Sequence, residues 1–122
     1  MQKPLDRSIH VVLTLVFAAS VFTMTSAVFA DESVVENGKK VAFDRKAGNC
    51  LSCHLIEGGE APGNLGPPLV AMKARFPDRQ RLRDIIWDIT TSRPEALMPP
   101  FGRYKIISEQ DIDDIVEYLY TL

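Results

Sequence analysis

Near the middle of the chain stands Cys50-Leu51-Ser52-Cys53-His54, a C-x-x-C-H motif. Two thiols at this spacing can each form a thioether to one vinyl group of the same porphyrin. A histidine directly after the second cysteine can place its imidazole under the iron. The motif also contains both cysteines of the 122-residue chain. It therefore predicts one covalently attached haem c, with thioethers at Cys50 and Cys53 and with His54 as an axial ligand of the iron.

Three alternatives compete with haem attachment at this motif. A redox C-x-x-C usually follows a strand and opens a helix, whereas residues 38–48 have helical spacing and the chain shows no strand alternation. A structural zinc ion takes four ligands, and the other histidine, His10, lies near the N-terminus. A disulfide between Cys50 and Cys53 would close a very small and strained loop. We therefore favour haem attachment over all three.

The N-terminus has the organisation of an export signal. Two basic residues precede an uncharged run from Ser8 to Ala30, and polarity returns at Asp31. Val28 and Ala30 suit the positions three and one before a cleavage site. We expect residues 1–30 to be a cleaved signal peptide, the protein to be periplasmic, and residues 31–122 to form one domain. The uncharged run is also long enough to span a bilayer, so an uncleaved anchor is the alternative.

Composition sets limits on the exported part of the chain. The whole chain has 14 basic and 16 acidic residues, and removal of the leader leaves twelve and fifteen. This mildly acidic balance gives no basic stripe of the kind that nucleic-acid binding requires. A domain of this length buries a limited core by itself, so a covalently held porphyrin would supply an apolar centre.

The first segment with helical spacing precedes the motif. Its stripe comprises four residues, Val34, Gly38, Val41 and Ala42. Gly38 lowers helix stability at an interior position, which is compensated where a second helix crosses too closely for a side chain. We predict a helix that is crossed at Gly38 and is ended by Gly48-Asn49.

Two further amphipathic helices are predicted downstream. Leu82, Ile85, Ile86 and Ile89 form the stripe of a helix from about Asp78 to Thr90, with Asp88 expected to face away and Trp87 to pack in the core. A contact between Trp87 and the haem is the alternative. A shorter helix over Leu69–Phe76 is expected before it.

The last helix should begin after Ser108, a good N-cap that is followed by acidic residues. Its apolar stripe comprises Ile112, Ile115, Val116 and Leu119, while the carboxylates of Asp113, Asp114 and Glu117 are expected to be solvated. A terminal helix frays unless it is docked. The first helix, with Gly38 on its stripe, is the natural partner.

A glycine- and proline-rich stretch, Glu57–Pro68, is predicted to be a loop. A histidine that binds a metal almost always donates its second ring N–H to an acceptor, often a backbone carbonyl. Pro67, or a neighbour within Gly66–Leu69, could supply this carbonyl to His54. The alternative is a stiff loop without that role.

Met98 is the candidate for the second axial ligand. It precedes Pro99 in an irregular stretch, and a residue before proline is biased away from helical dihedrals. A thioether is a soft ligand that suits haem iron. The alternatives are that Met98 fills the core and that Met72 is the ligand. Met72 lies only eighteen residues after His54, which makes the opposite haem face harder to reach, so we favour Met98.

The first helix, the C-x-x-C-H motif, the proline-rich loop, the middle helix, the Met-Pro loop and the last helix together resemble a class I cytochrome c. This resemblance implies an all-α fold of about four helices around one covalent haem. More narrowly, residues 38–54, 63–69, 98–102 and 111–119 are similar to the SoxX family, and the run Ala42–Asn49 is the most specific part. That family provides the small monohaem subunit of the SoxAX thiosulfate-oxidising cytochromes.

The resemblance implies roles for residues and for partners. Cys50 and Cys53 would be the thioether sites, His54 and Met98 the axial ligands, and Pro67 the carbonyl beside His54. A SoxA-type partner subunit, with one or two haems, would carry the sulfur chemistry at a Cys-ligated haem. The complex would act as an L-cysteine S-thiosulfotransferase, joining thiosulfate to a carrier-protein cysteine and passing two electrons to a soluble cytochrome c. No catalytic residue is expected in this chain.

Three functions are compatible with these features. The first is an electron-relay subunit of such a sulfur-oxidising enzyme. The second is a free-standing cytochrome that shuttles electrons to a terminal oxidase or another respiratory partner. The third is a haem sensor, which needs an open iron position, and a methionine at Met98 that can occupy that position argues against it.

Overall fold

The computed structural model describes residues 26–122, with side chains described from Glu32 onward. The chain divides into two units, Met1–Asp31 and Glu32–Leu122. The predicted signal peptide, residues 1–30, lies outside the described residues except for its last five. None of the helices in the described part is long and apolar enough to cross a membrane.

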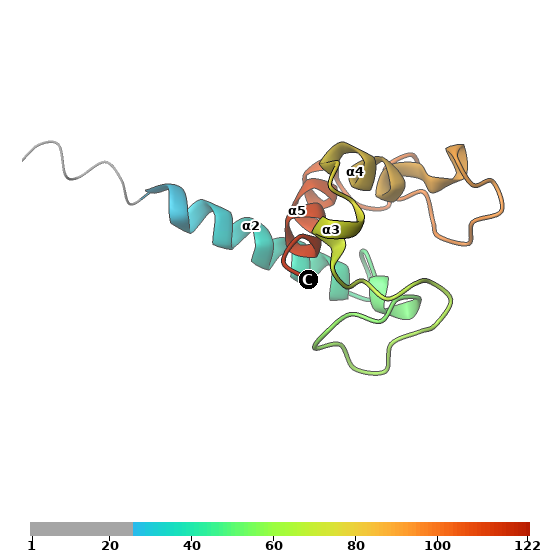
Figure 1. Ribbon diagram of the computed structural model, residues 1–122, viewed down its shortest axis with the longest axis horizontal. Coiled ribbons are helices and arrows are strands. Elements are labelled where there is room, and N and C mark those ends of the chain that lie inside the picture. Colours follow the sequence, from blue (N-terminus) through green and yellow to red (C-terminus); the bar gives the residue numbers. More distant parts are fainter. Residues whose placement is uncertain (1–25) are drawn as a thin grey trace, which may run out of the picture. The chain divides into compact units, whose positions relative to one another are not determined.

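Four α-helices and two short 3-10 helices make up the regular structure of the described residues, which contain no strand (Figure 1). In chain order they are α2 (Ser26–Phe43), η1 (Cys50–Ser52), α3 (Met72–Arg75), α4 (Arg79–Asp88), η2 (Ile89–Thr91) and α5 (Glu109–Leu119). The all-α fold expected from the sequence is confirmed.

The crossing of α2 and α5 is closest at Gly38. A Cβ built there would lie 2.8 Å from the backbone nitrogen of Ile115 and closer still to the carbonyl of Asp114. The prediction that Gly38 marks a helix crossing is therefore confirmed. Asp114 was expected to be solvated, and this expectation is wrong. Its carboxylate is 5% exposed and accepts hydrogen bonds from Asn37 at 2.6 Å and from Gln110 at 2.7 Å.

Ion pairs join α4 to α5. Arg83 Nε lies 2.6 Å from Asp113 Oδ1, and its Nη2 lies 3.2 Å from Glu109 Oε2. Arg79 pairs with Glu117 further along the same two helices. Apolar side chains from the helices and from the segments that connect them fill the core. Its largest fully buried members are Ile56, Ile112, Ile115 and Val116.

Local sequence explains where the helices begin and end. The start of α5 was predicted correctly, and the end of the first helix was not. Ser108 and Asp111 form a reciprocal capping box at the start of α5, so the predicted N-cap is confirmed. The first helix ends at Phe43 rather than at Gly48. The reason is Asp44, whose carboxylate accepts from Lys46 N at 2.8 Å and so offers the backbone an alternative to the helix.

The middle helices are shorter than predicted. Only Met72–Arg75 is helical within the expected span Leu69–Phe76, because Ala71 has a left-handed backbone conformation at φ 49°. The helix α4 ends at Asp88, whose own backbone is extended. Asp88 was expected to face away from the core, but it is only 5% exposed, so that expectation is wrong.

Candidate functional site

The C-x-x-C-H motif is wound into a single tight turn. Asn49 enters it with a left-handed conformation, and η1 follows at once. The Cys50 carbonyl oxygen accepts from Cys53 N at 3.2 Å and from His54 N at 2.9 Å. One backbone carbonyl therefore fixes the relative positions of both cysteines and the histidine. The two thiols are free, and Cys50 packs against the apolar core.

Burial controls the state of the Cys50 thiol. It raises the pKa of Cys50 from an ordinary value of 9.0 to about 11, and the neighbouring Cys53 adds to the rise. A cysteine that exchanges disulfides needs a depressed pKa, because the thiolate is the nucleophile. The environment of Cys50 is thus the opposite of a redox C-x-x-C site.

The His54 imidazole is oriented by one hydrogen bond. Its Nδ1 lies 2.7 Å from the Pro67 carbonyl oxygen. A carbonyl can only accept, so Nδ1 donates in this hydrogen bond and Nε2 is the ring nitrogen left to bind a metal. Among the residues that the structure describes, none hydrogen-bonds Nε2. This arrangement is typical of a histidine that binds a metal through one nitrogen while a backbone carbonyl holds the other.

The loop after the motif returns alongside it. Three backbone hydrogen bonds of 2.8 Å join the two segments, namely Gly63 N to Leu51 O, Gly66 N to Cys53 O, and Leu69 N to Leu55 O. A Cβ at Gly66 would lie 2.6 Å from His54 Nδ1, and one at Gly63 would lie 3.0 Å from Cys53 Cα. Sequence reasoning treated both glycines only as loop formers. Their spacing of three residues opposite the motif was the available signal.

Arg75 fastens the far end of this loop. Its Nη1 donates to the Pro68 carbonyl at 2.7 Å and lies 3.5 Å from the sulfur of Met72. Met72 is 2% exposed, and its backbone N donates to Leu122 O at 3.1 Å. The Met72 thioether is therefore enclosed in the core and already has a polar neighbour.

Met98 lies on an irregular segment between η2 and the turn at Gly102. Its side chain is half-buried and packs against the core, whereas the preceding Leu97 is 80% exposed. Trp87 also packs against the core, with Gly102 directly against its indole ring. The core role expected for Trp87 is thus confirmed.

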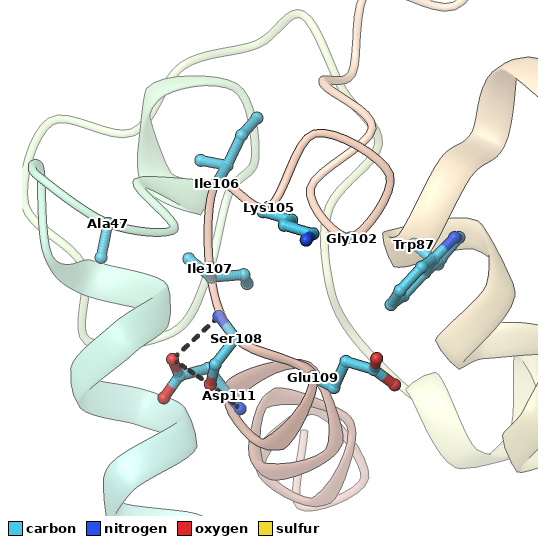
Figure 2. A pocket seen from close by; sticks show the side chains of 9 residues that line it. All are labelled: Ala47, Trp87, Gly102, Lys105, Ile106, Ile107, Ser108, Glu109 and Asp111. Atoms are coloured by element: carbon cyan, nitrogen blue, oxygen red, sulfur yellow. Dashed lines mark hydrogen bonds between the residues drawn. The ribbon is translucent and has the colours of Figure 1, made fainter.

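A cavity of about 500 Å³ lies near the start of α5, and Figure 2 shows the side chains around it. Trp87, Ile107 and Glu109 line it, together with the backbone at Gly102. None of Cys50, Cys53, His54 or Met98 belongs to its lining. The cavity is therefore separate from the candidate donor set.

The donor set fits haem c. Two free thiols lie one turn apart, an imidazole is held at Nδ1 with Nε2 unengaged by any described residue, and a thioether lies on the same apolar core. These are a soft sulfur and a nitrogen donor of the kind that haem iron takes. Across residues 26–122 there is no group of three or more His, Cys, Asp or Glu side chains placed to hold a metal ion.

Comparison with known proteins also indicates a protein that binds haem c. The family model described as Cytochrome c matches residues 35–122. A chain of the crystal structure of SoxXA from P. pantotrophus matches with a TM-score of 0.63 and 27% sequence identity. That match covers 70% of this chain and 79% of the other. A search of curated proteins found no match.

Proposed function

Because this chain belongs to the cytochrome c family, we propose that it relays electrons as the SoxX-type subunit of a thiosulfate-oxidising SoxAX complex. Membership of the family implies covalently bound haem c and electron transfer. The finer assignment rests on one observation, the likeness to a chain of SoxXA over 79% of its length. The residues 42–49 before the motif, which resemble SoxX, support it independently.

The chain's own residues would hold the group as follows. Cys50 and Cys53 would tether the porphyrin, His54 and Met98 would bind the iron, and the Pro67 carbonyl would keep the His54 ring in one tautomer. When bound, the iron supplies one-electron redox chemistry, and a histidine–methionine pair raises its potential. The stiff Met98-Pro99-Pro100 backbone presents the thioether with little entropy left to lose.

The sulfur chemistry is assigned to a partner. The chain has two cysteines in all, and thioether bonds would use both, which leaves no thiol to hold a sulfur substrate. A SoxA-type cytochrome would therefore carry the reacting sulfur and pass its electrons to this chain. A soluble cytochrome c would then accept them. We place the complex in the periplasm, on the signal peptide expected at residues 1–30.

A free-standing electron shuttle is the second candidate. It uses the same haem and the same ligands and differs only in its partners. The high exposure of Leu97 and Leu65, at 80% and 70%, suits either function, because both need a surface that another protein can meet.

Co-purification separates the two candidates. A tagged chain is isolated from its own cells grown with thiosulfate and, as the control, from cells grown without it. Stained for covalent haem after denaturing electrophoresis, the thiosulfate-grown sample should contain a second c-type cytochrome in a fixed ratio to this chain. When the reduced partner is then mixed with the oxidised chain, it should pass electrons directly to the haem of the chain in a single encounter.

Two results would contradict the subunit proposal. One is a chain that elutes alone from thiosulfate-grown cells while remaining rapidly reducible by respiratory donors, which favours the shuttle. The other is a c-type partner that binds but does not exchange electrons with this chain.

A further inference from the structure

We propose that Asp88 is a positioning residue for Met98, because its single buried carboxylate fastens both ends of the loop that carries the thioether. The inference rests on the proposed ligand role of Met98. It assigns to a residue ten positions away the task of holding that ligand against the iron.

The entry to the loop is fixed by one carboxylate oxygen. Asp88 Oδ1 accepts from the Thr90 backbone N at 2.9 Å and from the Thr90 hydroxyl at 2.5 Å. The Asp88 backbone carbonyl also accepts from the Thr91 hydroxyl at 3.0 Å. These bonds turn the chain out of α4 and into η2, and so set the direction in which the loop leaves.

The exit from the loop is fixed by the other oxygen. Asp88 Oδ2 lies 3.1 Å from Nη1 of Arg103. The carbonyl of the adjacent Trp87 accepts from Gly102 N at 3.1 Å and from Arg103 N at 3.3 Å. Residues 92–101 are thus closed into a loop whose two ends meet at consecutive residues of α4.

Within the loop, contact with the core is made by Phe101, which is 7% exposed, and by Met98. Residues 91–95 and Leu97 are exposed, and the backbone bonds there are short-range, such as Ala96 N to Arg93 O at 3.0 Å. The exposed first half has little burial of its own, so it takes its stability from its ends. Asp88 is only 5% exposed, whereas its partner Arg103 is 57% exposed, so solvent screens the pair with Arg103 more than the bonds to Thr90. Bonds from the Thr90 hydroxyl and Arg103 lower the pKa of Asp88, which keeps the carboxyl ionised at neutral pH.

Imidazole binding to the oxidised holoprotein measures how firmly Met98 stays on the iron. The probe is imidazole itself, titrated at constant neutral pH, with the near-infrared sulfur–iron band followed in parallel. Asp88→Asn keeps the size but places an amide where Arg103 needs a charged acceptor. Loss of this partly exposed charge-assisted bond should raise imidazole affinity by about threefold or more. Arg103→Gln should also raise imidazole affinity. Arg103→Lys keeps a positive charge, so its imidazole affinity should lie between those of Arg103→Gln and wild type.

Asp114→Asn is the matched control. Asp114 is buried to the same 5% and also accepts two side-chain hydrogen bonds, but it does so at the crossing of α2 and α5. The Asp114→Asn substitution should lower the resistance of the protein to denaturant and leave its imidazole affinity unchanged. If Asp88→Asn does not yield folded protein, Arg103→Gln carries the test, because Arg103 is 57% exposed.

The outcomes separate this inference from the proposed ligand set. A wild-type protein without the near-infrared band overturns Met98 as ligand, and the inference with it. A wild-type band with unchanged imidazole affinity in Arg103→Gln and Asp88→Asn overturns the inference alone. An equal rise in Asp114→Asn also overturns it, because the effect would then reflect general loss of stability.

Discussion

The ring of His54 owes its orientation to a neighbour that has little freedom to move. The Pro67 carbonyl lies 2.7 Å from Nδ1, and the residues around it are held by Gly66 N to Cys53 O and by Arg75 to Pro68 O. Pro67 has a fixed φ and the following Pro68 restricts its ψ, so the acceptor stays in place. Loss of such a partner of a ligating histidine typically costs about 10- to 100-fold in metal affinity or activity.

Gly66→Ala tests how closely the loop must approach the imidazole. The added Cβ would lie 2.6 Å from His54 Nδ1, so either the ring or the loop must shift. We expect the free energy of unfolding to fall by about 2 kcal/mol, from overpacking, and the electron paramagnetic signal of the oxidised haem to change. Denaturant titration and the paramagnetic spectrum measure the two effects.

Gly58→Ala is the control for that experiment. Gly58 lies in the same loop at φ 75°, with nothing within 4 Å of an added Cβ. Backbone strain alone should cost about 1 kcal/mol and leave the haem spectrum unchanged. An unaltered spectrum in Gly66→Ala as well would contradict the close packing of loop and imidazole.

Some residue roles could be predicted from the sequence, and others could not. The capping role of Ser108 was readable because its partner, Asp111, is three residues away. Asp88 and Asp114 looked like ordinary surface carboxylates because the groups that bury them are distant. Arg103 is 15 residues from Asp88, and Asn37 is 77 residues from Asp114. The spacing of polar and apolar residues shows which face of a helix is polar. It cannot show that a carboxylate on that face is buried by a partner far away in the sequence.

At the scale of the elements, the crossing of α2 and α5 leaves no room for a side chain at Gly38. The Gly38 backbone meets the Asp114 carbonyl, and Asn37 donates to the Asp114 carboxylate beside it. The sequence signalled this crossing, because a glycine within an apolar helical stripe weakens the helix unless a second backbone passes close to it. The end of α2 was not predictable in the same way, because Asp44 competes locally with the Gly48-Asn49 signal.

Gly38→Ala should separate the two helices. The new Cβ would collide with backbone rather than with a flexible side chain, so relaxation requires a helix to move. We expect a loss of about 3 kcal/mol in the free energy of unfolding, despite the better helix propensity of alanine. Guanidinium titration of the holoprotein, followed by far-ultraviolet circular dichroism, gives the value.

Lys40→Ala serves as the comparison on the same helix. Lys40 is exposed, and its replacement should change stability by less than about 0.5 kcal/mol. Equal stability of Gly38→Ala and Lys40→Ala would contradict the crossing geometry.

At the scale of the whole molecule, the described unit from Glu32 onward is small, and its core is modest. The motif turn and the Met98 segment both pack on that core. A covalently held porphyrin between them would add the apolar volume that a chain of this size lacks. Electron transfer and stability would then depend on the same group.

A cleaved N-terminus is a further prediction. A cut after Ala30 would fall within one residue of the boundary between the two units, Met1–Asp31 and Glu32–Leu122. It would also leave Asp31 and Glu32 at the start of the shortened helix, where negative charge is favourable. Intact-mass measurement of periplasmic and membrane fractions should find a haem-bearing chain that begins at or near Asp31. Full-length chain recovered from membranes would indicate an anchor instead.

The near-infrared spectrum of the oxidised protein tests the central claim, that His54 and Met98 hold the haem iron. Wild type should show the weak sulfur–iron charge-transfer band. Met98→Leu should abolish it and lower the reduction potential, because the potential follows the axial ligand. Met72→Leu, a volume-conserving change in the core that costs under about 1.5 kcal/mol, should leave both unchanged. A band that survives in Met98→Leu and disappears in Met72→Leu, or a wild-type iron without the band, would contradict this ligand pair.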